Sequence, residues 1–234
     1  MTTVKVIGVG VLGPALPDWA SAQLLLREPA AWQRVATVIP SPQRLPPAER
    51  RRAGNVIKAS IAVADEALIA CGLPASALPT VFTSSTGDPL NCHLLCEALA
   101  TAERMVSPTR FTNSVHNAAA GYWHIAAQSR QPSTSLAAFD ASFAAGLLEA
   151  AVQVHSTNAA VLFVACDVPY PEPLHALRPV EDVMAVALVL APESSSGRLL
   201  RIEMANGDMP ITRCADAAFE ALRVGIPAAR ALPL

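Results

Sequence analysis

The 234-residue sequence has little charge, few aromatic residues and no long apolar run. Charged residues make up 15% of it and aromatic residues 5%, whereas apolar residues reach 52%. Seventeen Lys and Arg stand against 19 Asp and Glu, which gives a net charge of −2. A nucleic-acid-binding domain usually carries a basic surface, so this balance argues against that class. A large apolar share with so little charge indicates a surface that a partner hides.

No stretch of the sequence is apolar enough to predict a membrane span. Runs such as residues 159–166 hold about eight apolar residues, whereas a spanning helix needs about 20. The first 13 residues are apolar, but they contain Lys5 and precede Pro14. That pattern is typical of a strand rather than of a signal peptide.

Cysteine is scarce, and its spacing gives no disulfide framework. The five cysteines stand at positions 71, 92, 96, 166 and 214, an odd number without a CxxC pair. This usage favours a reducing, cytoplasmic compartment. Cys92, His93 and Cys96 come nearest to a metal-binding pattern, but no second pair of ligands has matching spacing. We therefore expect Cys92 and Cys96 to be buried as small hydrophobic residues, and we expect no metal and no cofactor.

Strands and helices alternate along the predicted fold. A first strand is expected over Val4–Val11, and one long helix over Ala48–Cys71, which Gly72 ends. Arg50, Arg51 and Arg52 would lie in the first turns of that helix, where the helix dipole disfavours cations. Further elements are expected as a helix around 19–27, a strand at 80–84 and helices at 90–104, 113–128 and 213–224.

The second half of the sequence contains a strand–helix–strand unit. The strands are expected at Ser135–Phe139 and Ala160–Ala165, with a helix over Ala141–His155 between them. Both strands are apolar runs, which is typical of parallel strands covered on both faces. Two more strands, Val183–Leu190 and Leu199–Met204, are separated by a serine-rich segment that favours a hairpin turn. The sequence thus predicts one layered α/β domain over residues 1–234.

The order of motifs between residues 106 and 190 resembles the N-terminal half of a β-ketoacyl synthase. Residues 106–121 are similar to that family's ISP…N…(A/G)G segment, and residues 132–142 to its nucleophile turn. Residues 178–190 resemble, more weakly, its RP(F/W)D…GEGAGVLVLE strand. Residues 111–123 further resemble the short chain-length-factor proteins of bacterial aryl polyene (xanthomonadin-type) pathways. The resemblance implies a thiolase-like half-fold, in which helices cover a mixed sheet.

Two departures from the family pattern bear on function. Active ketosynthases carry a cysteine at the strand-to-helix turn, where the helix N-terminus stabilises the thiolate that accepts the acyl group. In this sequence the position falls on Asp140, whose acyl product would be a mixed anhydride that hydrolyses. The family's second half supplies two catalytic histidines, one of them in an HGT-type motif. None of the five histidines here is followed by Gly-Thr.

The resemblance therefore implies a non-catalytic, chain-length-factor-like subunit. Its expected partners are a full-length ketosynthase in a heterodimer, or a second copy of itself, and an acyl carrier protein. In the family, the strand before the nucleophile turn pairs the two subunits, and residues after the ISP segment reach the acyl tunnel of the partner. Carried over to this sequence, the pairing residues are Leu136, Ala137, Ala138 and Phe139, and the tunnel residues are Arg110, Phe111 and Asn113. The Arg50–Arg52 run is either a solvated cluster or a contact for the acidic carrier protein or a partner subunit.

Asp140 also has interpretations that need no family. An aspartate before Ala141-Ser142 is typical of a helix N-cap, because its carboxylate can accept from the free N–H groups of the first turn. In a second interpretation the chain is an enzyme, with Asp140 and His116 or another histidine as general base on a carrier-bound acyl chain. Dehydration, isomerisation and thioester hydrolysis would all fit such a base. A third interpretation is a homodimeric acyl-binding module without chemistry.

Overall fold

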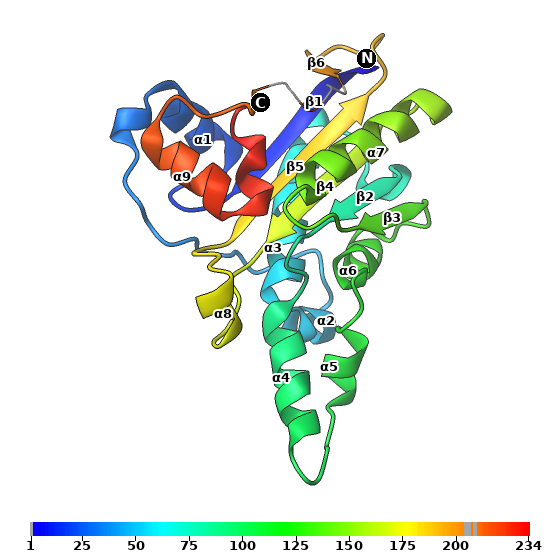
Figure 1. Ribbon diagram of the computed structural model, residues 1–234. Helices are drawn as coiled ribbons and strands as arrows, with labels where there is room; N and C mark the ends of the chain where they lie inside the picture. The colour runs from blue at the N-terminus through cyan, green and yellow to red at the C-terminus, as the bar shows by residue number, and fades with distance from the viewer. Residues whose placement is uncertain (1, 204–206, 208–209) are drawn as a thin grey trace.

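A six-stranded mixed sheet organises the part of the chain that the computed structural model describes, residues 2–203, 207 and 210–234 (Figure 1). Its strand order is β3-β2-β4-β5-β1-β6. The strands are β1 (Thr2–Leu12), β2 (Thr80–Thr83), β3 (Ser133–Leu136), β4 (Val161–Asp167), β5 (Met184–Ala191) and β6 (Arg198–Ile202). β2 runs parallel to β3 and β4, and the remaining neighbours are antiparallel. The prediction of a mixed sheet in a layered α/β domain is confirmed.

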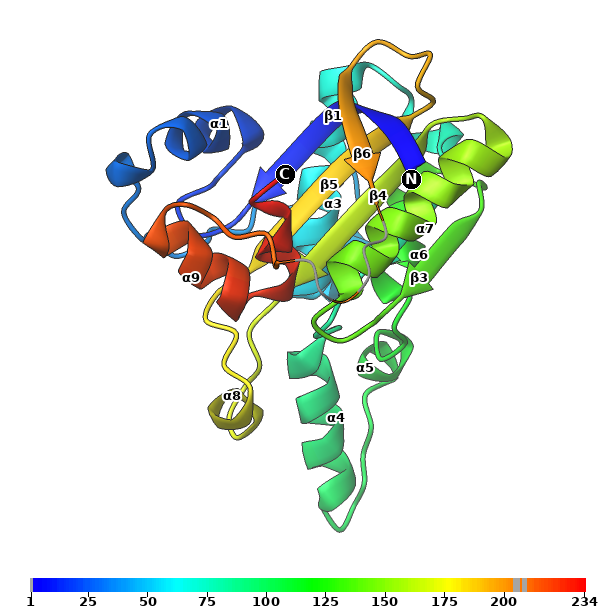
Figure 2. The ribbon, with the colours of Figure 1, turned by 45° about the horizontal axis from the view of Figure 1, so that its top comes forward.

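Helices cover both faces of this sheet. They are α1 (Trp19–Arg27), α2 (Pro47–Arg52), α3 (Asn55–Cys71), α4 (Pro89–Ala100), α5 (Pro108–Thr112), α6 (Ala118–Ala127), α7 (Ser142–Thr157), α8 (Leu174–Leu177) and α9 (Ala217–Gly225), with 3₁₀ turns η1 (Pro29–Ala31), η2 (Ala75–Ala77) and η3 (Pro227–Ala231). α3 and α6 pack on one face, and α7 packs on the other beside α1, α9 and η3 (Figures 1 and 2). α4 and α5 project away from the sheet as an arm. Among the helices of the described residues, none is both long enough and apolar enough to cross a membrane.

The core depends on a close contact between α3 and β1. Every residue of β4 and β5 is buried, as expected of apolar strands covered on both faces. β1 approaches α3 through two glycines. A Cβ at Gly8 would collide with the carbonyl oxygen of Ala67, and a Cβ at Gly10 with that of Val63. Glu66, also on α3, accepts hydrogen bonds from the backbone N–H groups of Val11 and Trp19, which fixes the start of α1 against β1.

The prediction of a single long helix over residues 48–71 is wrong, because the helix is interrupted at Ala53-Gly54 and forms two helices, α2 and α3. Gly54 is the N-cap of α3, and a Cβ there would collide with the carboxylate of Asp88. The break places Arg50, Arg51 and Arg52 in the last turn of α2, where the helix dipole favours cations. The predicted end of the helix is confirmed, since Gly72 adopts the left-handed conformation at φ +70°.

The predicted hairpin between the last two strands is also wrong. β5 and β6 do not pair with each other, because β1 lies between them and pairs with both. The turn residues between β5 and β6 carry no information about a distant strand, so they could not predict that β1 lies between the two. The last strand, predicted to reach Met204, is observed over Arg198–Ile202, and Met204 itself lies outside the described residues.

Four other predicted elements are shorter than expected or shifted. The helix predicted over 113–128 begins only at Ala118, and α4 ends at Ala100 rather than at residue 104. The strand predicted over 135–139 is observed at Ser133–Leu136, and the last helix, predicted over 213–224, is Ala217–Gly225. In each case capping and turn geometry set a boundary that apolar periodicity alone does not mark.

Gly10→Ala tests the contact between β1 and α3. The added methyl group has to displace the α3 backbone at Val63, so the free energy of unfolding should fall by about 3 kcal/mol. Gly121→Ala is the matched control, because nothing lies within 4 Å of a Cβ at that exposed helical position. Its stability should stay unchanged or rise by up to about 1 kcal/mol. Urea unfolding of both variants gives the comparison, and equal stabilities would contradict the close approach.

Candidate functional site

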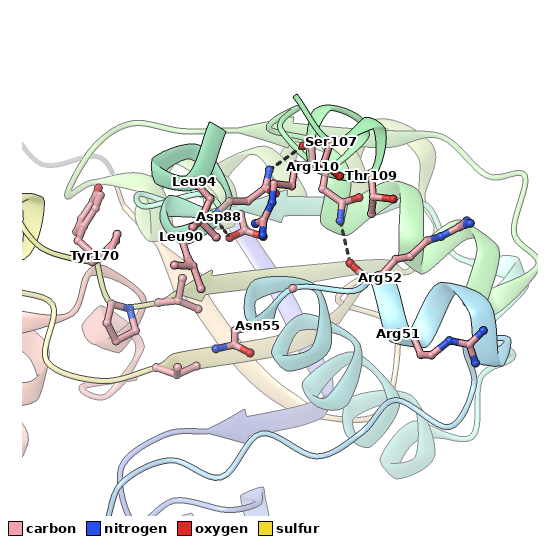
Figure 3. Close-up of a pocket in the computed structure, with 17 residues that line it drawn as sticks. Arg51, Arg52, Asn55, Asp88, Leu90, Leu94, Ser107, Thr109, Arg110 and Tyr170 are labelled. Carbon is pink, nitrogen blue, oxygen red and sulfur yellow. Dashed lines mark hydrogen bonds between the residues drawn. The ribbon is translucent and has the colours of Figure 1, made fainter. Parts of the chain in front are cut away.

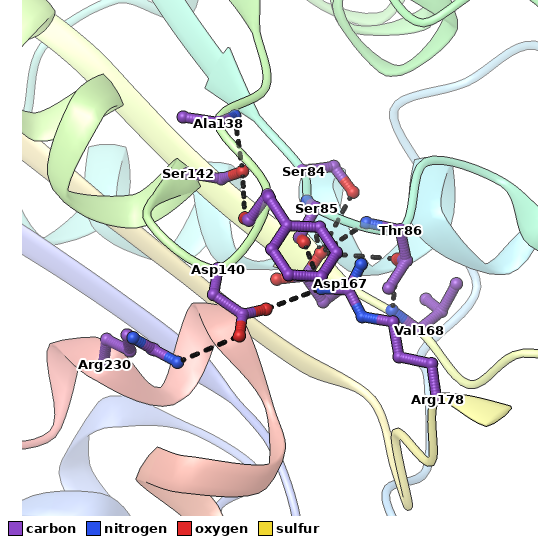
Figure 4. Close-up of polar contacts among 11 residues, drawn as sticks. Ser84, Ser85, Thr86, Ala138, Asp140, Ser142, Asp167, Val168, Arg178 and Arg230 are labelled. Atoms are coloured by element: carbon purple, nitrogen blue, oxygen red, sulfur yellow. Dashed lines mark hydrogen bonds and ion pairs between the residues drawn. The ribbon is translucent and has the colours of Figure 1, made fainter.

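The turn between β3 and α7 carries the residue at the expected nucleophile position. β2, β3 and β4 run parallel, so their carboxyl ends meet at this edge of the sheet. The Ser142 hydroxyl closes the turn by accepting from the Ala138 N–H at 2.9 Å and donating to the Phe139 carbonyl at 2.6 Å. Phe139 adopts a left-handed backbone conformation, φ +50°, which aromatic residues seldom take. Asp140 lies in this turn, as the sequence predicts (Figure 4).

Asp140 does not cap α7. The N-cap residue is Ala141, and no side chain accepts a hydrogen bond there. The two carboxylate oxygens face guanidinium groups instead. Oδ1 lies 2.7 Å from a terminal nitrogen of Arg178, and Oδ2 lies 3.6 Å from one of Arg230 (Figure 4). The capping prediction is wrong because charge-assisted bonds to arginine are stronger than bonds to neutral backbone amides.

Arg178 joins three segments of the chain around this turn. The nitrogen that contacts Asp140 also donates to the Ser85 hydroxyl at 2.7 Å, in the loop after β2. Its guanidinium carbon lies 3.8 Å from the ring centroid of Phe139, a cation–π stack. Phe139 is still 64% exposed, so Arg178 covers one face of the ring and the rest of the side chain is accessible. The guanidinium group therefore occupies the space beside the residue at the nucleophile position.

Asp167, at the end of β4, fixes the loop that holds Ser85. Its carboxylate is 2% exposed and accepts from the Ser85 N–H at 2.6 Å, the Thr86 N–H at 3.0 Å and the Ser84 hydroxyl at 3.2 Å. Burial raises the pKa of the Asp167 carboxyl above the usual aspartate range, although these hydrogen bonds and one from the Ala228 backbone lower it in part. A buried acid thus ties the ends of β2 and β4 together next to Arg178.

The predicted base pair of Asp140 and His116 does not come together. His116 is exposed in the turn before α6, where its Nε2 lies 3.4 Å from the Ser84 carbonyl oxygen. No hydrogen bond or ion pair joins His116 to Asp140 in the described part of the chain. Asp140 instead has arginine on both sides, and within residues 2–203, 207 and 210–234 no histidine forms a hydrogen bond or ion pair with it.

Several of the predicted tunnel and carrier-contact residues line one cavity of about 640 Å³ between α2, α3, the arm and residues 168–171 (Figure 3). They are Arg51, Arg52, Arg110 and Asn113. Asn113 is buried, and its amide donates to the Arg52 carbonyl at 2.9 Å and accepts from the Tyr122 hydroxyl at 3.1 Å. Arg50 is outside the cavity lining and donates to Gln43 and to the Leu45 carbonyl.

Exposed apolar side chains lie on the arm and along the β3 side of the sheet. Phe111 is 68% exposed, and the other large exposed ones there are Leu90, Leu99, Met105, Val115, Ile125 and Phe139. α5, α6 and β3 lie on the same side of the molecule in both views (Figures 1 and 2). The predicted burial of Cys92 and Cys96 is wrong, because both are exposed on α4. The arm is too thin to give α4 an enclosed core.

The sequence alone does not predict the polar cluster of Ser85, Asp140, Arg178 and Arg230. The sequence pattern includes Arg178 only within the weak motif of residues 178–190, and it assigns no role to Ser85. Arg230 carries no local signal for this contact, since it lies 90 positions after Asp140 in an alanine-rich segment. The one usable signal is that the segments after β2, β3 and β4 each carry a polar side chain near a carboxyl end of a parallel strand.

Comparison with known proteins gives a consistent result. The family profile described as β-ketoacyl synthase, N-terminal domain, matches residues 19–221. One chain of the solved complex of a ketosynthase (ApeO) with its chain length factor (ApeC) from Xenorhabdus doucetiae is 26% identical, with a TM-score of 0.70. That match covers 82% of this chain and 80% of the other. A comparison with curated proteins found no match.

Two more distant structures share the fold. The ishigamide ketosynthase/chain length factor is 15% identical with a TM-score of 0.64, over 85% of this chain and 64% of the other. A β-ketoacyl synthase from Burkholderia phymatum is 15% identical with a TM-score of 0.63, over 82% and 59%. This chain therefore spans about three fifths of these two structures, and at such identities the likeness concerns the fold alone.

Asp167→Asn tests the buried carboxyl. Because the folded pKa is raised, the folded state binds more protons between the unfolded pKa, about 4, and the folded value. Asp167 therefore stabilises the fold fully below pH 4, and this contribution is lost as the pH rises through the folded pKa. In wild type, the free energy of unfolding should therefore fall as the pH rises above about 4. In the Asp167→Asn variant this fall should be smaller, because the contribution of Asp167 is absent. Glu103→Gln, at an exposed site, should keep it, and identical pH profiles for wild type and Asp167→Asn would contradict the assignment.

Proposed function

The chain belongs to the family of β-ketoacyl synthase N-terminal domains, and from this premise we propose that it is a non-catalytic, chain-length-factor-like subunit. It would pair with a full-length ketosynthase that bears the cysteine nucleophile. The pair would extend a polyene or fatty-acid-type chain with malonyl units delivered on an acyl carrier protein. The likeness to a chain of the ketosynthase and chain length factor complex supports this role.

The observation that carries the proposal is the ion pair at the nucleophile position. Acyl transfer needs a thiolate that is free to attack. Here the side chain is a carboxylate, and each of its oxygens faces a guanidinium group. Phe139 and Arg178 cover its neighbourhood with a stacked pair. Such an arrangement stabilises the turn and leaves no nucleophile to load.

The stand-alone enzyme is less well supported. A general base has to come within hydrogen-bond reach of its substrate, and its proton needs an acceptor or relay. Asp140 contacts arginines, and His116 contacts the Ser84 carbonyl oxygen instead. Dehydration, isomerisation or thioester hydrolysis by this pair would require both side chains to leave these positions.

The free edge of β3 and the apolar residues beside it support a pairing surface. β3 is an edge strand, and edge strands with unpaired backbone groups readily accept another strand. We propose that Leu136–Phe139 face the ketosynthase and that Arg110 and Phe111 reach its acyl tunnel. Asn113 would position this segment, because its side chain is held by Arg52 and Tyr122. When the ketosynthase is missing, a second copy of the chain could cover the same surface.

Of the three arginines in the Arg50–Arg52 run, only one is proposed for carrier recognition, because the other two make contacts within the chain. Arg50 is held by Gln43 and Leu45, and Arg52 by Glu49 at 3.1 Å. Arg51 is exposed and is the member we propose for contact with the acidic carrier protein. A cytoplasmic location for the pair stays a prediction from the cysteine pattern.

The isolated protein should form no stable acyl-enzyme. Incubation with an acyl-loaded carrier protein, followed by intact mass spectrometry, should leave its mass unchanged, because the nucleophile position holds an arginine-paired carboxylate. Asp140→Ala should give the same result. A cysteine-bearing ketosynthase treated identically is the positive control and should gain the acyl mass. A lasting adduct on any residue of this chain would overturn the proposal.

Ala138→Glu should break the pairing. Ala138 is exposed in the turn beside the β3 edge, so a glutamate there would bury an unpaired carboxylate at the interface. We expect binding to a ketosynthase from the same genome to weaken about 100-fold, measured by sedimentation or co-purification. Ala221→Glu, on the exposed face of α9 and away from β3, should bind like the wild type. Equal binding of the two variants would place the interface elsewhere.

A further inference from the structure

A second large concavity is lined by residues other than those of the nucleophile turn, although its Ala231 directly follows Arg230, which faces Asp140. It is a groove of about 750 Å³ between β1, β5, β6, α1 and the C-terminal residues 231–234. Aliphatic side chains make its floor, among them Val9 and Val11 of β1 and Val186 and Leu188 of β5. Neither Asp140 nor Arg178 lines it. The groove thus shares no lining residue with the surface proposed for pairing.

The groove exists because β6 covers only part of β1. β1 runs from Thr2 to Leu12, but β6 pairs only with its residues Thr2–Val6. Beyond that point α1 takes the place of a neighbouring strand, since Glu66 holds both the Val11 and the Trp19 N–H groups. A helix and a strand cannot meet as closely as two strands in a ladder, so an open channel remains between α1 and β6.

The lining chemistry is that of a site for an apolar chain with an anionic end. Among the described residues that line the groove, most are aliphatic, Arg27 and Arg198 are cationic, and none is acidic. Both arginines are exposed, and neither is in an ion pair within the described part of the chain. Small-molecule sites of about 300–1,000 Å³ are typically apolar with a few polar groups that fix orientation. A guanidinium group is well suited to a carboxylate at the end of such a ligand.

We propose that this groove binds the unbranched long-chain carboxylate of a free fatty acid, with its hydrocarbon chain over β1 and β5 and its carboxylate at Arg27 and Arg198. The assignment does not depend on the proposed pairing with a ketosynthase. Trp19 lines the groove and gives it an intrinsic reporter. The other two tryptophans, Trp32 and Trp123, do not line it.

Fluorescence titration of the whole protein tests the apolar part of the proposal. Octanoate, decanoate and dodecanoate, each kept below its micellar concentration, should quench or shift the Trp19 emission. Affinity should rise with chain length, at most about fourfold for each methylene group that becomes buried. Trp19→Phe should abolish the signal, while isothermal calorimetry should still detect binding. Absence of binding by both methods, or an affinity independent of chain length, would overturn the proposal.

Charge variants test the anionic end. Arg198→Gln should weaken dodecanoate binding about tenfold, the effect of losing one charge-assisted bond. Arg201→Gln is the matched control, because it removes the same charge from the same strand but lies outside the groove. Methyl dodecanoate, which has no charge, should bind wild type no more tightly than dodecanoate binds the Arg198→Gln variant.

Four results would contradict this assignment. Equal binding of the acid and its methyl ester would show adsorption to an apolar surface without a carboxylate site. Equal losses in the Arg198→Gln and Arg201→Gln variants would show a general charge effect. Binding to anionic phospholipid vesicles without binding to free fatty acid, or self-association that buries Trp19, would assign the groove to a membrane or to a second copy. None of these results affects the test of pairing with a ketosynthase, so the two proposals fail separately.

Discussion

The guanidinium group of Arg178 holds together the three chain segments on which the account of this protein depends. It binds Asp140 after β3 and Ser85 after β2, and its own segment follows β4. Asp167 secures the Ser85 loop from the buried side through backbone and hydroxyl donors. The carboxyl ends of three parallel strands are therefore tied by charge-assisted bonds at the place where the family places its thiolate. The cation–π contact between Arg178 and Phe139 also holds the Phe139 ring beside the free edge of β3, although the Phe139 backbone is left-handed.

This arrangement keeps the strand-to-helix turn of the fold and places an arginine-paired carboxylate where the family has its cysteine. A strand-to-helix turn with a free helix N-terminus favours an anion, and a carboxylate satisfies that preference without being a useful acyl acceptor. Two arginines then neutralise the carboxylate and draw it away from the helix. The site also presents an exposed aromatic ring, Phe139, in the turn that follows the edge strand β3. Interfaces are enriched in such aromatic and arginine pairs.

The sequence was sufficient to predict the elements whose signal is local. β4 and β5 are apolar runs covered on both faces, and α7 is periodic between a turn and a left-handed Asn158. The prediction failed where the outcome depends on contacts distant in sequence. The long helix breaks at Gly54, where a side chain would collide with the Asp88 carboxylate, and β1 separates β5 from β6. The role of Asp140 depended on Arg178 and Arg230, which are 38 and 90 positions away, so local capping rules gave the wrong partner.

The most direct measurement is an elongation assay with purified components: a ketosynthase from the same genome, acyl and malonyl carrier proteins, and this chain present or absent. The account predicts elongated product only when both subunits are present. It also predicts no product when the ketosynthase cysteine is replaced by alanine, whatever the amount of this chain. A ketosynthase that makes full-length product alone, or turnover that persists after its cysteine is removed, would contradict the account.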